Sequence, residues 1–425
     1  MKIKKSEFVH SVIVLMSGTV MAQALTYLIS PILTRIYSTE EMGDLGIFLR
    51  AVGFISALAT ARYELSIPLP KNESHSFLLY RLSLQIAKYT LIACTIIGIV
   101  YLISQPFDVN QLVFVVITLV SSIFLVIINL GTNWAIRKKH FKKISYSKVT
   151  NSFVSNGLRW FFGVMNLGSF GLLFASLIGY IVSSFTFFKE LFQLKKEHAG
   201  LISAKKTYVL SKVYNQFPMV SLPHVLLDLG RDLLIASLII SFFSKDIFGS
   251  YNHSYTILKL PLAFIGVSIG QVFFNRCNEM INEGKPIINL LNKTILSLVA
   301  ISIIPFTVIF FFGKPLFSFV FSEQWEMSGY YSEIMAVWLF FNFLSSPTSS
   351  IPLILHRQKE YFIMGLISTV LQLIGFGVLP FVLGTSKDAF VQILWFVSIT
   401  QTILLIFMIF ITLYYARKGV KVIGS

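Results

Sequence analysis

Six basic side chains fall inside long apolar stretches of this 425-residue chain. At the centre of a lipid bilayer each of them would cost roughly 2.5–3.5 kcal/mol. A helix bundle tolerates such a charge where it faces a hydrated cavity, a partner of opposite charge or an anionic ligand. The six, which we take as candidates for a buried binding site, are Arg50, Arg62, Lys88, Arg159, Arg231 and Lys259.

Embedded acidic residues are fewer, namely Glu64, Asp228, Asp232 and Glu333. The interior is therefore net positive, which suits an anionic ligand such as a phosphate or pyrophosphate group. A guanidinium binds such groups through paired hydrogen bonds. The same acids are candidates for gating or for coupling to H⁺ or Na⁺. No protein-bound metal or other cofactor is predicted.

The stretch 214–242 is the most polar of the apolar segments, because it contains Asp228, Arg231 and Asp232. Spacings of three and four residues place all three on one helix face. They can form an internal ion cluster that neutralises itself. Alternatively, the arginine binds an anion or the carboxylates bind a coupling cation. Both interpretations remain open at this point.

The other embedded cations differ in their expected depth. Arg62 is near the inner end of its segment, where it could extend to the membrane surface beside Glu64. Arg50 lies about two helical turns below the outer face, and Lys259 is near mid-depth. Lys88 and Arg159 are at a similar depth. Arg159 lies in the segment with the weakest apolar pattern, 149–166, which Ser152, Ser155 and Asn156 also interrupt.

Composition indicates an integral membrane protein. Hydrophobic residues make up 55% of the chain and charged residues only 13%, whereas soluble proteins have about a quarter charged residues. The net charge of +16 does not indicate nucleic-acid binding, because the basic residues are dispersed between apolar segments. Cys94 and Cys277 form neither a metal motif nor a disulfide framework.

Catalytic motifs are missing from the sequence. It contains no glycine-rich phosphate loop, HExxH, CxxC or nucleophile elbow. A membrane enzyme that polymerises sugars would need a large outer loop for its acceptor, and the longest outer connections, near 103–110 and 313–328, are short. We therefore predict that the protein is not an enzyme.

Apolar segments long enough to cross a bilayer number about twelve. They span residues 8–34, 42–68, 77–103, 110–132, 149–166, 169–190, 214–242, 247–273, 288–312, 328–354, 361–383 and 389–415. The predicted fold class is an all-α, multi-pass membrane protein. We interpret the first segment as a retained helix, although Ala22-Gln23-Ala24 resembles a signal-peptidase site.

The distribution of basic residues predicts the topology. With both termini in the cytoplasm, the inner connections hold most of the lysines and arginines. The outer turns then hold only Arg35, Lys245, Lys314 and Lys387. This asymmetry follows the positive-inside rule and requires an even number of spans.

Two turns of the chain resemble each other at an offset close to half its length. Residues 37–44 are similar to residues 243–250, and residues 137–141 are similar to residues 357–361. We therefore predict two pseudo-symmetric six-helix lobes, 1–205 and 206–425. Repeats with the same orientation place a substrate cavity between the halves and allow alternating access.

The segment 23–70 resembles a known family. The sequence Ser-Pro-Ile-Leu-Thr-Arg-Ile-Tyr-Ser at 30–38 and the ending Arg-Tyr-Glu-Leu-Ser-Ile-Pro-Leu-Pro at 62–70 carry the resemblance. They are similar to Wzx-type polysaccharide biosynthesis flippases of the multidrug/oligosaccharidyl-lipid/polysaccharide (MOP) exporter superfamily. The fold this resemblance implies is MATE-like, with two lobes around a central cavity.

The resemblance implies a bacterial inner-membrane protein that moves undecaprenyl-pyrophosphate-linked O-antigen or capsule repeats to the periplasmic leaflet. Its partners would be the lipid-linked oligosaccharide, membrane lipids, and a polysaccharide polymerase with its chain-length regulator. On this basis Arg50, Arg159, Arg231 and Lys259 become head-group candidates, with Lys88 as a further one. Arg35, Arg62 and Glu64 match the family motif and are candidates for gating or folding.

Two alternatives to a flippase remain, a transporter of another molecule and an enzyme. A cation-coupled drug exporter of the same superfamily often has a cation-binding aspartate in its first helix. Here the first helix has only Glu7 and no buried aspartate, which counts against that branch. A membrane polysaccharide polymerase is the other alternative, and it is disfavoured by the short outer loops.

Overall fold

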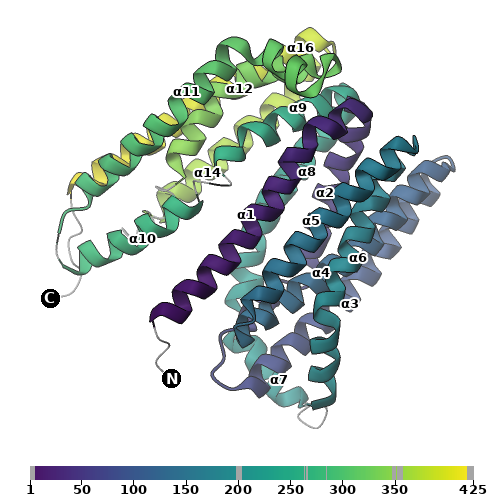
Figure 1. The fold of residues 1–425 in the computed structure, drawn as a ribbon, viewed down its shortest axis with the longest axis vertical. Helices are drawn as coiled ribbons and strands as arrows, with labels where there is room; N and C mark the ends of the chain where they lie inside the picture. Colours follow the sequence, from purple (N-terminus) through teal and green to yellow (C-terminus); the bar gives the residue numbers. More distant parts are fainter. Residues whose placement is uncertain are drawn as a thin grey trace. The chain divides into compact units, whose positions relative to one another are not determined.

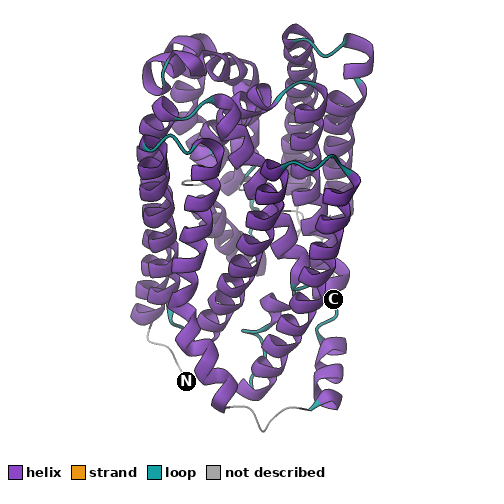
Figure 2. Ribbon diagram, turned by 90° about the vertical axis from the view of Figure 1, so that its right-hand side faces the viewer, coloured by secondary structure: helices purple, strands orange, loops and turns teal. Residues whose placement is uncertain are grey.

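The computed structural model describes residues 5–197, 203–262, 264, 267–283, 285–346, 351 and 358–418. Within these ranges the chain is helical and forms no strand (Figure 2), so the predicted all-α fold class is confirmed. The chain divides into two compact units, Met1–Leu234 and Ile235–Ser425. Both chain ends, which the sequence places in the cytoplasm, fall outside the described residues.

The first unit is built mostly from long helices joined by short turns (Figure 1). Its elements are α1 (Lys5–Ile36), α2 (Thr39–Ala59), the 3₁₀ turn η1 (Tyr63–Ser66), α3 (Glu73–Ser104), α4 (Val109–Lys138), α5 (Phe141–Val164), α6 (Gly168–Glu197), α7 (Ala204–Val213), the π turn η3 (Phe217–Ser221) and the start of α8 (Leu222–Phe242).

The second unit continues from within α8. Its described elements are α9 (Lys245–Leu258), α10 (Val267–Asn282), α11 (Ile288–Phe321), η5 (Glu323–Trp325), α12 (Glu326–Ser345), α14 (Gln358–Leu373), the π turn η7 (Ile374–Val378), α15 (Pro380–Leu383) and α16 (Lys387–Lys418).

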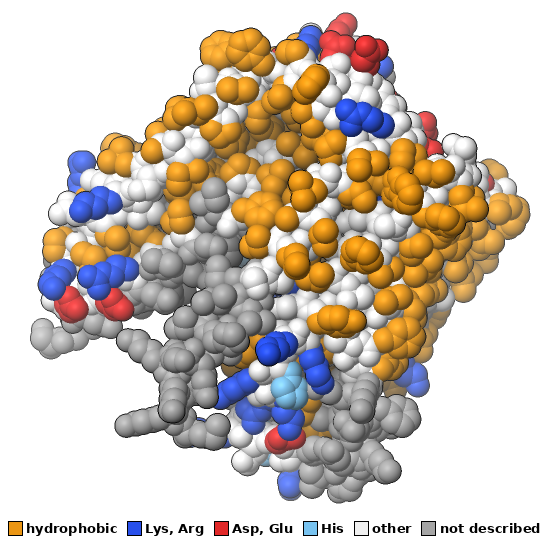
Figure 3. Space-filling view, in the orientation of Figure 1, with side chains coloured by type: hydrophobic (Ala, Val, Ile, Leu, Met, Phe, Trp, Pro, Cys, Tyr) orange, Lys and Arg blue, Asp and Glu red, His pale blue; other side chains and the backbone are white. Residues whose placement is uncertain are grey.

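Seven helical segments of the described chain are long and apolar enough to cross a membrane. They are Thr39–Ala59, Glu73–Ser104, Val109–Lys138, Gly168–Phe188, Ile288–Phe321, Lys359–Leu383 and Lys387–Arg417. On α3 a row of exposed isoleucines, including Ile96, Ile97 and Ile103, faces outward. Hydrophobic side chains dominate the flank of the molecule where α3 lies (Figure 3). These features identify a multi-pass membrane protein.

Two of the expected spans differ from the observed helices. The helix in the span expected at 42–68 ends at Ala59. Ala61 and Arg62 have positive φ angles of 47° and 62°, which are incompatible with a right-handed α-helix. The span expected at 247–273 is divided, since α9 ends at Leu258 and α10 begins at Val267. Pro261 lies in this interval, where a proline removes a backbone donor.

The turn between α1 and α2 is fixed by a capping box. Ser38 Oγ accepts a hydrogen bond from the Glu41 backbone N–H at 3.2 Å, and the Ser38 N–H donates to Glu41 Oε2 at 2.7 Å. The preceding residue, Tyr37, is only 1% exposed and packs in a core with Leu33 and Phe48. The Tyr-Ser pair of the family motif therefore sets the angle between α1 and α2.

The boundary between the two units along the chain falls within α8, later than the expected lobe boundary at residue 205. The reason is α7, whose Leu210 belongs to a core cluster with residues of α3 and α4. Tyr63 in η1 adds a hydrogen bond from its hydroxyl to the Ser211 carbonyl at 3.0 Å. These contacts attach α7 to the first unit.

In the second unit α11 and α12 cross at very close range. α11 is kinked at Phe312, whose backbone angles of −130° and 22° are not helical, three residues before Pro315. Gly313 and Gly329 lie in contact at the crossing, where a Cβ on either residue would overlap the other's backbone. The pair of glycines allows the two helix backbones to touch.

We predict that Gly329→Ala destabilises the second unit by about 1–3 kcal/mol, because the added methyl group overlaps the Gly313 carbonyl. Gly365→Ala is the matched control, since a Cβ there meets nothing within 4 Å and alanine favours a helix by up to about 1 kcal/mol. Thermal unfolding of the purified protein in detergent measures both. Equal melting temperatures for the two variants would contradict the close crossing.

Candidate functional site

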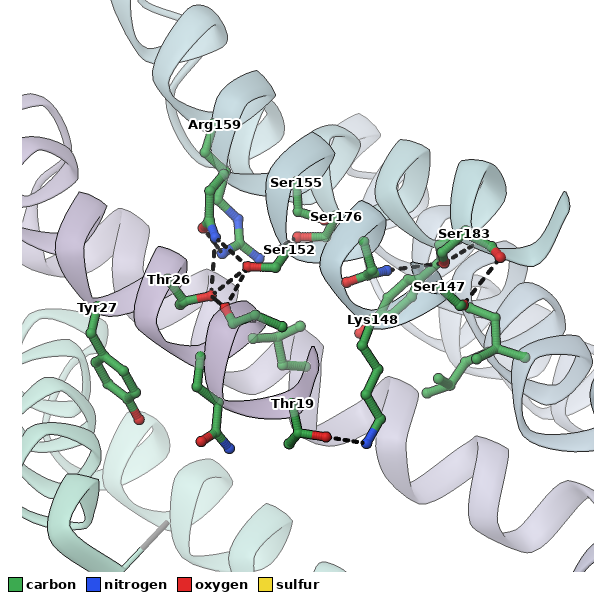
Figure 4. Close-up of a pocket in the computed structure, with 18 residues that line it drawn as sticks. Thr19, Thr26, Tyr27, Ser147, Lys148, Ser152, Ser155, Arg159, Ser176 and Ser183 are labelled. Atoms are coloured by element: carbon green, nitrogen blue, oxygen red, sulfur yellow. Dashed lines mark hydrogen bonds between the residues drawn. The ribbon is translucent and has the colours of Figure 1, made fainter. Parts of the chain in front are cut away.

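A cavity of about 500 Å³ lies inside the first unit, between α1, α2, α4, α5 and α6 (Figure 4). Most of the side chains that line it carry a hydroxyl or an amide group. Those on α1, α5 and α6 that form the polar wall include Thr26, Asn151, Ser152, Ser155, Asn156 and Ser176. Several of these groups are hydrogen-bonded to one another, as Asn156 is to Thr26 and Ser152.

One face of α5 contributes a polar row to the cavity. Lys148, Ser152, Ser155 and Arg159 follow at spacings of four, three and four residues, so they share one side of the helix. Lys148 and Arg159 lie at opposite ends of the row, with Ser152 between them (Figure 4). Eleven residues of α-helix correspond to about 16 Å along its axis.

Arg159 is held by two neutral side chains. Its Nη1 donates to Asn156 Oδ1 at 3.1 Å, and its Nη2 donates to Ser176 Oγ on α6 at 2.9 Å. Ser176 in turn donates to the Leu172 carbonyl at 2.8 Å. These contacts fix the plane of the guanidinium group in the cavity.

Asn156 connects Arg159 to α1. Its Nδ2 donates to Thr26 Oγ1 at 3.0 Å and to Ser152 Oγ at 3.2 Å, while its Oδ1 accepts from Arg159. Ser152 Oγ also donates to the Ala22 carbonyl at 2.6 Å. The amide therefore uses both donors and its acceptor, which determines its orientation.

The positive charge of Arg159 has no carboxylate partner in the described part of the chain. None of the residues that line the cavity is Asp or Glu. The Arg159 Nε is buried and has no hydrogen-bond partner among the described residues. A guanidinium carries five N–H donors, and Asn156 and Ser176 accept only two of them. Three of the five donors of Arg159 therefore have no acceptor among the described residues.

The other end of the polar row is more open. Lys148 is exposed, and its Nζ donates to Thr19 Oγ1 on α1 at 3.0 Å. One helical turn further along α1, the Gln23 Oε1 is buried without a donor among the described residues. Arg159 and Gln23 thus each have one buried polar atom without a partner among the described residues.

Tyr37 anchors the deep end of the site. Its hydroxyl donates to the Arg159 backbone carbonyl at 2.7 Å. Because Tyr37 is buried at the junction of α1 and α2, this bond ties α5 to the turn that the family motif encodes. Sequence reasoning did not identify Tyr37, Asn156, Ser176 or Lys148 as site residues. The polar interruption of segment 149–166 was the signal that could have found Asn156.

The other predicted cations of the first unit lie outside this cavity lining. Arg50 on α2 donates from Nη1 to the Gly46 carbonyl at 3.0 Å. Arg35 is exposed near the end of α1, where its Nη1 donates to the Pro31 carbonyl at 2.8 Å. Lys88 is exposed on the outer apolar helix α3. The structure therefore does not bring Arg50 or Lys88 together with Arg159 in the cavity.

The acidic residues of α8 form an ion cluster with Arg231. Asp232 Oδ1 lies 3.0 Å from Arg231 Nη2, and Asp228 Oδ1 lies 3.8 Å from Arg231 Nη1. His224 Nδ1, one turn before, lies 3.4 Å from Asp228 Oδ2. Of the two interpretations of these residues, the geometry favours the internal ion cluster.

The Arg62 and Glu64 pair belongs to the turn after α2. Arg62 Nη1 lies 3.3 Å from Glu64 Oε1, and Glu64 is 2% exposed. Thr60 Oγ1 also donates to Glu64 Oε2. Arg137 on α4 donates to the backbone carbonyls of Pro68, Pro70 and Lys71 just beyond this turn. These contacts give the second half of the family motif a structural role.

The predicted residues of the second unit also have local partners. Lys259 Nζ lies 4.1 Å from the centre of the Tyr255 ring, a cation–π contact. Glu333 Oε1 accepts a hydrogen bond from the Lys314 backbone N–H at 2.8 Å. That N–H lies next to the kink at Phe312, so Glu333 stabilises the kinked backbone of α11.

Comparisons with known proteins identify a family and a fold. Residues 32–330 match the family described as polysaccharide biosynthesis protein. The fold is similar to an inward-facing multidrug resistance MATE family transporter of the MOP superfamily, with 15% identity over 96% of this chain and 99% of that chain and a TM-score of 0.67. No curated protein matches the chain.

Two further solved structures are similar. A MATE protein in complex with MaD3S has 14% identity over 96% of this chain and 97% of that chain, with a TM-score of 0.53. The eukaryotic MATE transporter AtDTX14 has 15% identity over 96% of both chains, with a TM-score of 0.51. At these identities the likeness shows the fold alone, and it confirms the predicted MATE-like fold.

We predict that Asn156→Asp raises the melting temperature of the protein. The new carboxylate would face Arg159, and the hydroxyl groups of Thr26 and Ser152, which now accept from the Asn156 amide, would turn to donate to it. Hydrogen bonds between charged groups contribute about 1.5–3 kcal/mol against about 1 kcal/mol for neutral ones, so the charged pair outweighs the bonds lost. Asn129→Asp on α4 is the matched control. Its amide donates to Ser56 at 3.0 Å and lies outside the cavity lining, so a carboxylate there lowers the melting temperature.

Differential scanning fluorimetry in detergent measures both variants. A similar loss of stability in the two variants would contradict the assignment of Arg159 as a cation without a protein counter-ion.

Proposed function

Because the chain belongs to the polysaccharide biosynthesis protein family, we propose that it is a flippase for a lipid-linked oligosaccharide. The molecule to be moved is an O-antigen or capsule repeat unit carried on undecaprenyl pyrophosphate. Transport is from the cytoplasmic to the periplasmic leaflet of a bacterial inner membrane, by alternating access, with both termini cytoplasmic. The observation that carries this proposal is the uncompensated guanidinium of Arg159 inside a hydroxyl-rich cavity.

The buried charge of Arg159 costs free energy in the absence of a ligand. A cation inside a membrane bundle is expensive unless an opposite charge or water stabilises it. The described chain provides Arg159 with no carboxylate, so the charge is retained at a cost in stability. A negatively charged substrate that enters the cavity would offset this cost and bind tightly for the same reason.

The side chains that line the cavity combine hydrogen-bonding groups with aromatic surface, a combination that suits a sugar. Ser152, Ser155 and Asn151 lie along one helix and present hydroxyl and amide groups to the space. Tyr27 and Tyr180 also line it and provide aromatic surface. The positive charge of Arg159 and Lys148 in the lining disfavours cationic drugs.

The energy for transport can come from a coupling cation or from consumption of the product. Asp228 and Asp232 are solvent-accessible carboxylates that could take up H⁺ or Na⁺ during the cycle. A polysaccharide polymerase with its chain-length regulator would consume the product in the periplasm. Its removal would favour net transport toward the periplasmic leaflet. In this scheme no covalent bond is made or broken and no cofactor takes part.

We predict that Arg159→Gln abolishes surface polysaccharide and traps the lipid-linked oligosaccharide on the cytoplasmic leaflet. Glutamine keeps hydrogen-bonding groups near Asn156 and Ser176 but removes the charge that stabilises the anionic head group. Surface polymer is measured by labelling intact cells, and the sidedness of the intermediate by its accessibility to a periplasmic glycosidase.

Arg276→Gln is the matched control. Arg276 is exposed and pairs with Glu279 at 2.6 Å in the second unit, so the same substitution leaves polymer at the wild-type level. Wild-type polymer in the Arg159→Gln strain would refute the site. Accumulation of single repeats on the outer leaflet in a deletion strain would instead identify a polymerase.

A further inference from the structure

We propose that helix α7 is a docking surface for anionic phospholipids of the cytoplasmic leaflet, whose phosphate groups are bound by Lys205, Lys206 and Lys212. The inference does not depend on which molecule the protein transports. α7 connects α6 to α8, and with 10 residues it is too short to cross a bilayer. The distribution of basic residues places this connection on the inner side of the membrane, where anionic lipids attract lysines.

One face of α7 is fixed against the rest of the first unit. Leu210 is 8% exposed and belongs to the same core cluster as Trp134 on α4, and Tyr214, one turn further along, packs against that cluster. The Tyr63 hydroxyl donates to the Ser211 carbonyl at 3.0 Å. These contacts set the rotation of α7 about its axis, so its opposite face is directed away from the core.

The opposite face of α7 combines lysines with apolar side chains. Two rows, each with spacings of three and four residues, run along this face: Lys205, Tyr208 and Lys212, and beside them Lys206, Val209 and Val213. Tyr208 is 64% exposed, Val209 53% and Val213 63%. The Lys212 Nζ lies 5.6 Å from the centre of the Tyr208 ring. Exposed apolar residues among lysines are typical of helices that lie in the membrane interface.

The lysines of α7 have no carboxylate partner in the described part of the chain. The sequence contains no Asp or Glu between Glu197 and Asp228. Lys138, at the end of α4, differs because its Nζ lies 2.5 Å from Glu73 Oε1. Figure 3 shows basic side chains gathered at the end of the first unit where α7 lies. This end therefore keeps a positive charge that the phosphate groups of lipids can balance.

The apolar side chains favour a lipid over a water-soluble acidic partner. Tyr208 and Val209 can enter the boundary between head groups and acyl chains, while the lysine ammonium groups extend to the phosphates. The neighbouring helix α3 continues the apolar surface. Tyr80 on α3 belongs to the same core cluster as Leu210, and Leu84, one turn further along α3, is 43% exposed. α7 thus adjoins a surface that lipid contacts.

The test is fluorescence quenching of the full-length protein in phosphatidylcholine vesicles by brominated lipids. A bimane label is attached at Val209→Cys in a Cys94→Ser background, and Cys277 is buried and does not react. Brominated phosphatidylglycerol is compared with brominated phosphatidylcholine at increasing fractions. We expect a preference for phosphatidylglycerol of at least about fivefold, which is the contribution of one lysine at an anionic membrane surface.

Ile97→Cys with the same label is the matched control, because Ile97 is 68% exposed on the apolar surface of α3. We expect the two brominated lipids to quench this label equally. Equal quenching by both lipids at position 209 would overturn the proposal, because α7 would then select no head group. No quenching at position 209 by either lipid would also overturn it, because α7 would then face water or a soluble partner.

Lysine variants identify the groups that bind the phosphates. Glutamine at all three lysines of α7 should abolish the preference measured at Val209→Cys, whereas arginine at the same positions should retain it. The control removes the same charge from other exposed lysines of the first unit by Lys71→Gln, Lys139→Gln and Lys142→Gln. We expect the preference to remain in this control and to fall in about 1 M salt. Equal loss in the two glutamine sets would overturn the proposal in favour of diffuse attraction.

Discussion

The charge of Arg159 is the constraint on which the first unit depends. It lies within a membrane protein, next to Asn156 and Ser176, and its described surroundings contain no carboxylate. Both contacts are neutral, so they orient the guanidinium without cancelling its charge. An ion pair would be more stable, as the clusters around Arg231 and Arg62 illustrate. This difference is the reason why Arg159, and neither Arg231 nor Arg62, is the residue on which the proposed binding site is based.

The family motif and the proposed binding site are connected through the backbone. Tyr37 follows α1, its neighbour Ser38 caps α2, and its hydroxyl reaches the carbonyl of Arg159. The second half of the motif forms a turn that Arg137 holds by three backbone carbonyls. The motif therefore encodes the geometry of helix junctions, and its arginines do not line the cavity.

The sequence was sufficient to predict a helical membrane protein with buried cations, because apolar length and charge distribution depend only on local composition. It also located Arg159 in the least apolar segment. It could not predict which cations share a cavity, because this depends on helix rotation and on distant partners. Asn156 contacts Thr26, which is 130 residues away in the sequence. Lys88 lies on α3, which is apolar on all sides, so its sequence does not indicate which face contacts lipid.

The polar row of α5 has a consequence for how the protein is made. A helix that carries Lys148, Asn151, Asn156 and Arg159 gains little from entering lipid alone, because each of these groups opposes its transfer from the translocon. Its partners are α1, synthesised earlier, and α6, which follows after a short turn. Biogenesis of α5 therefore requires that α1 remains beside the translocon and that α5 and α6 enter the bilayer together as a hairpin.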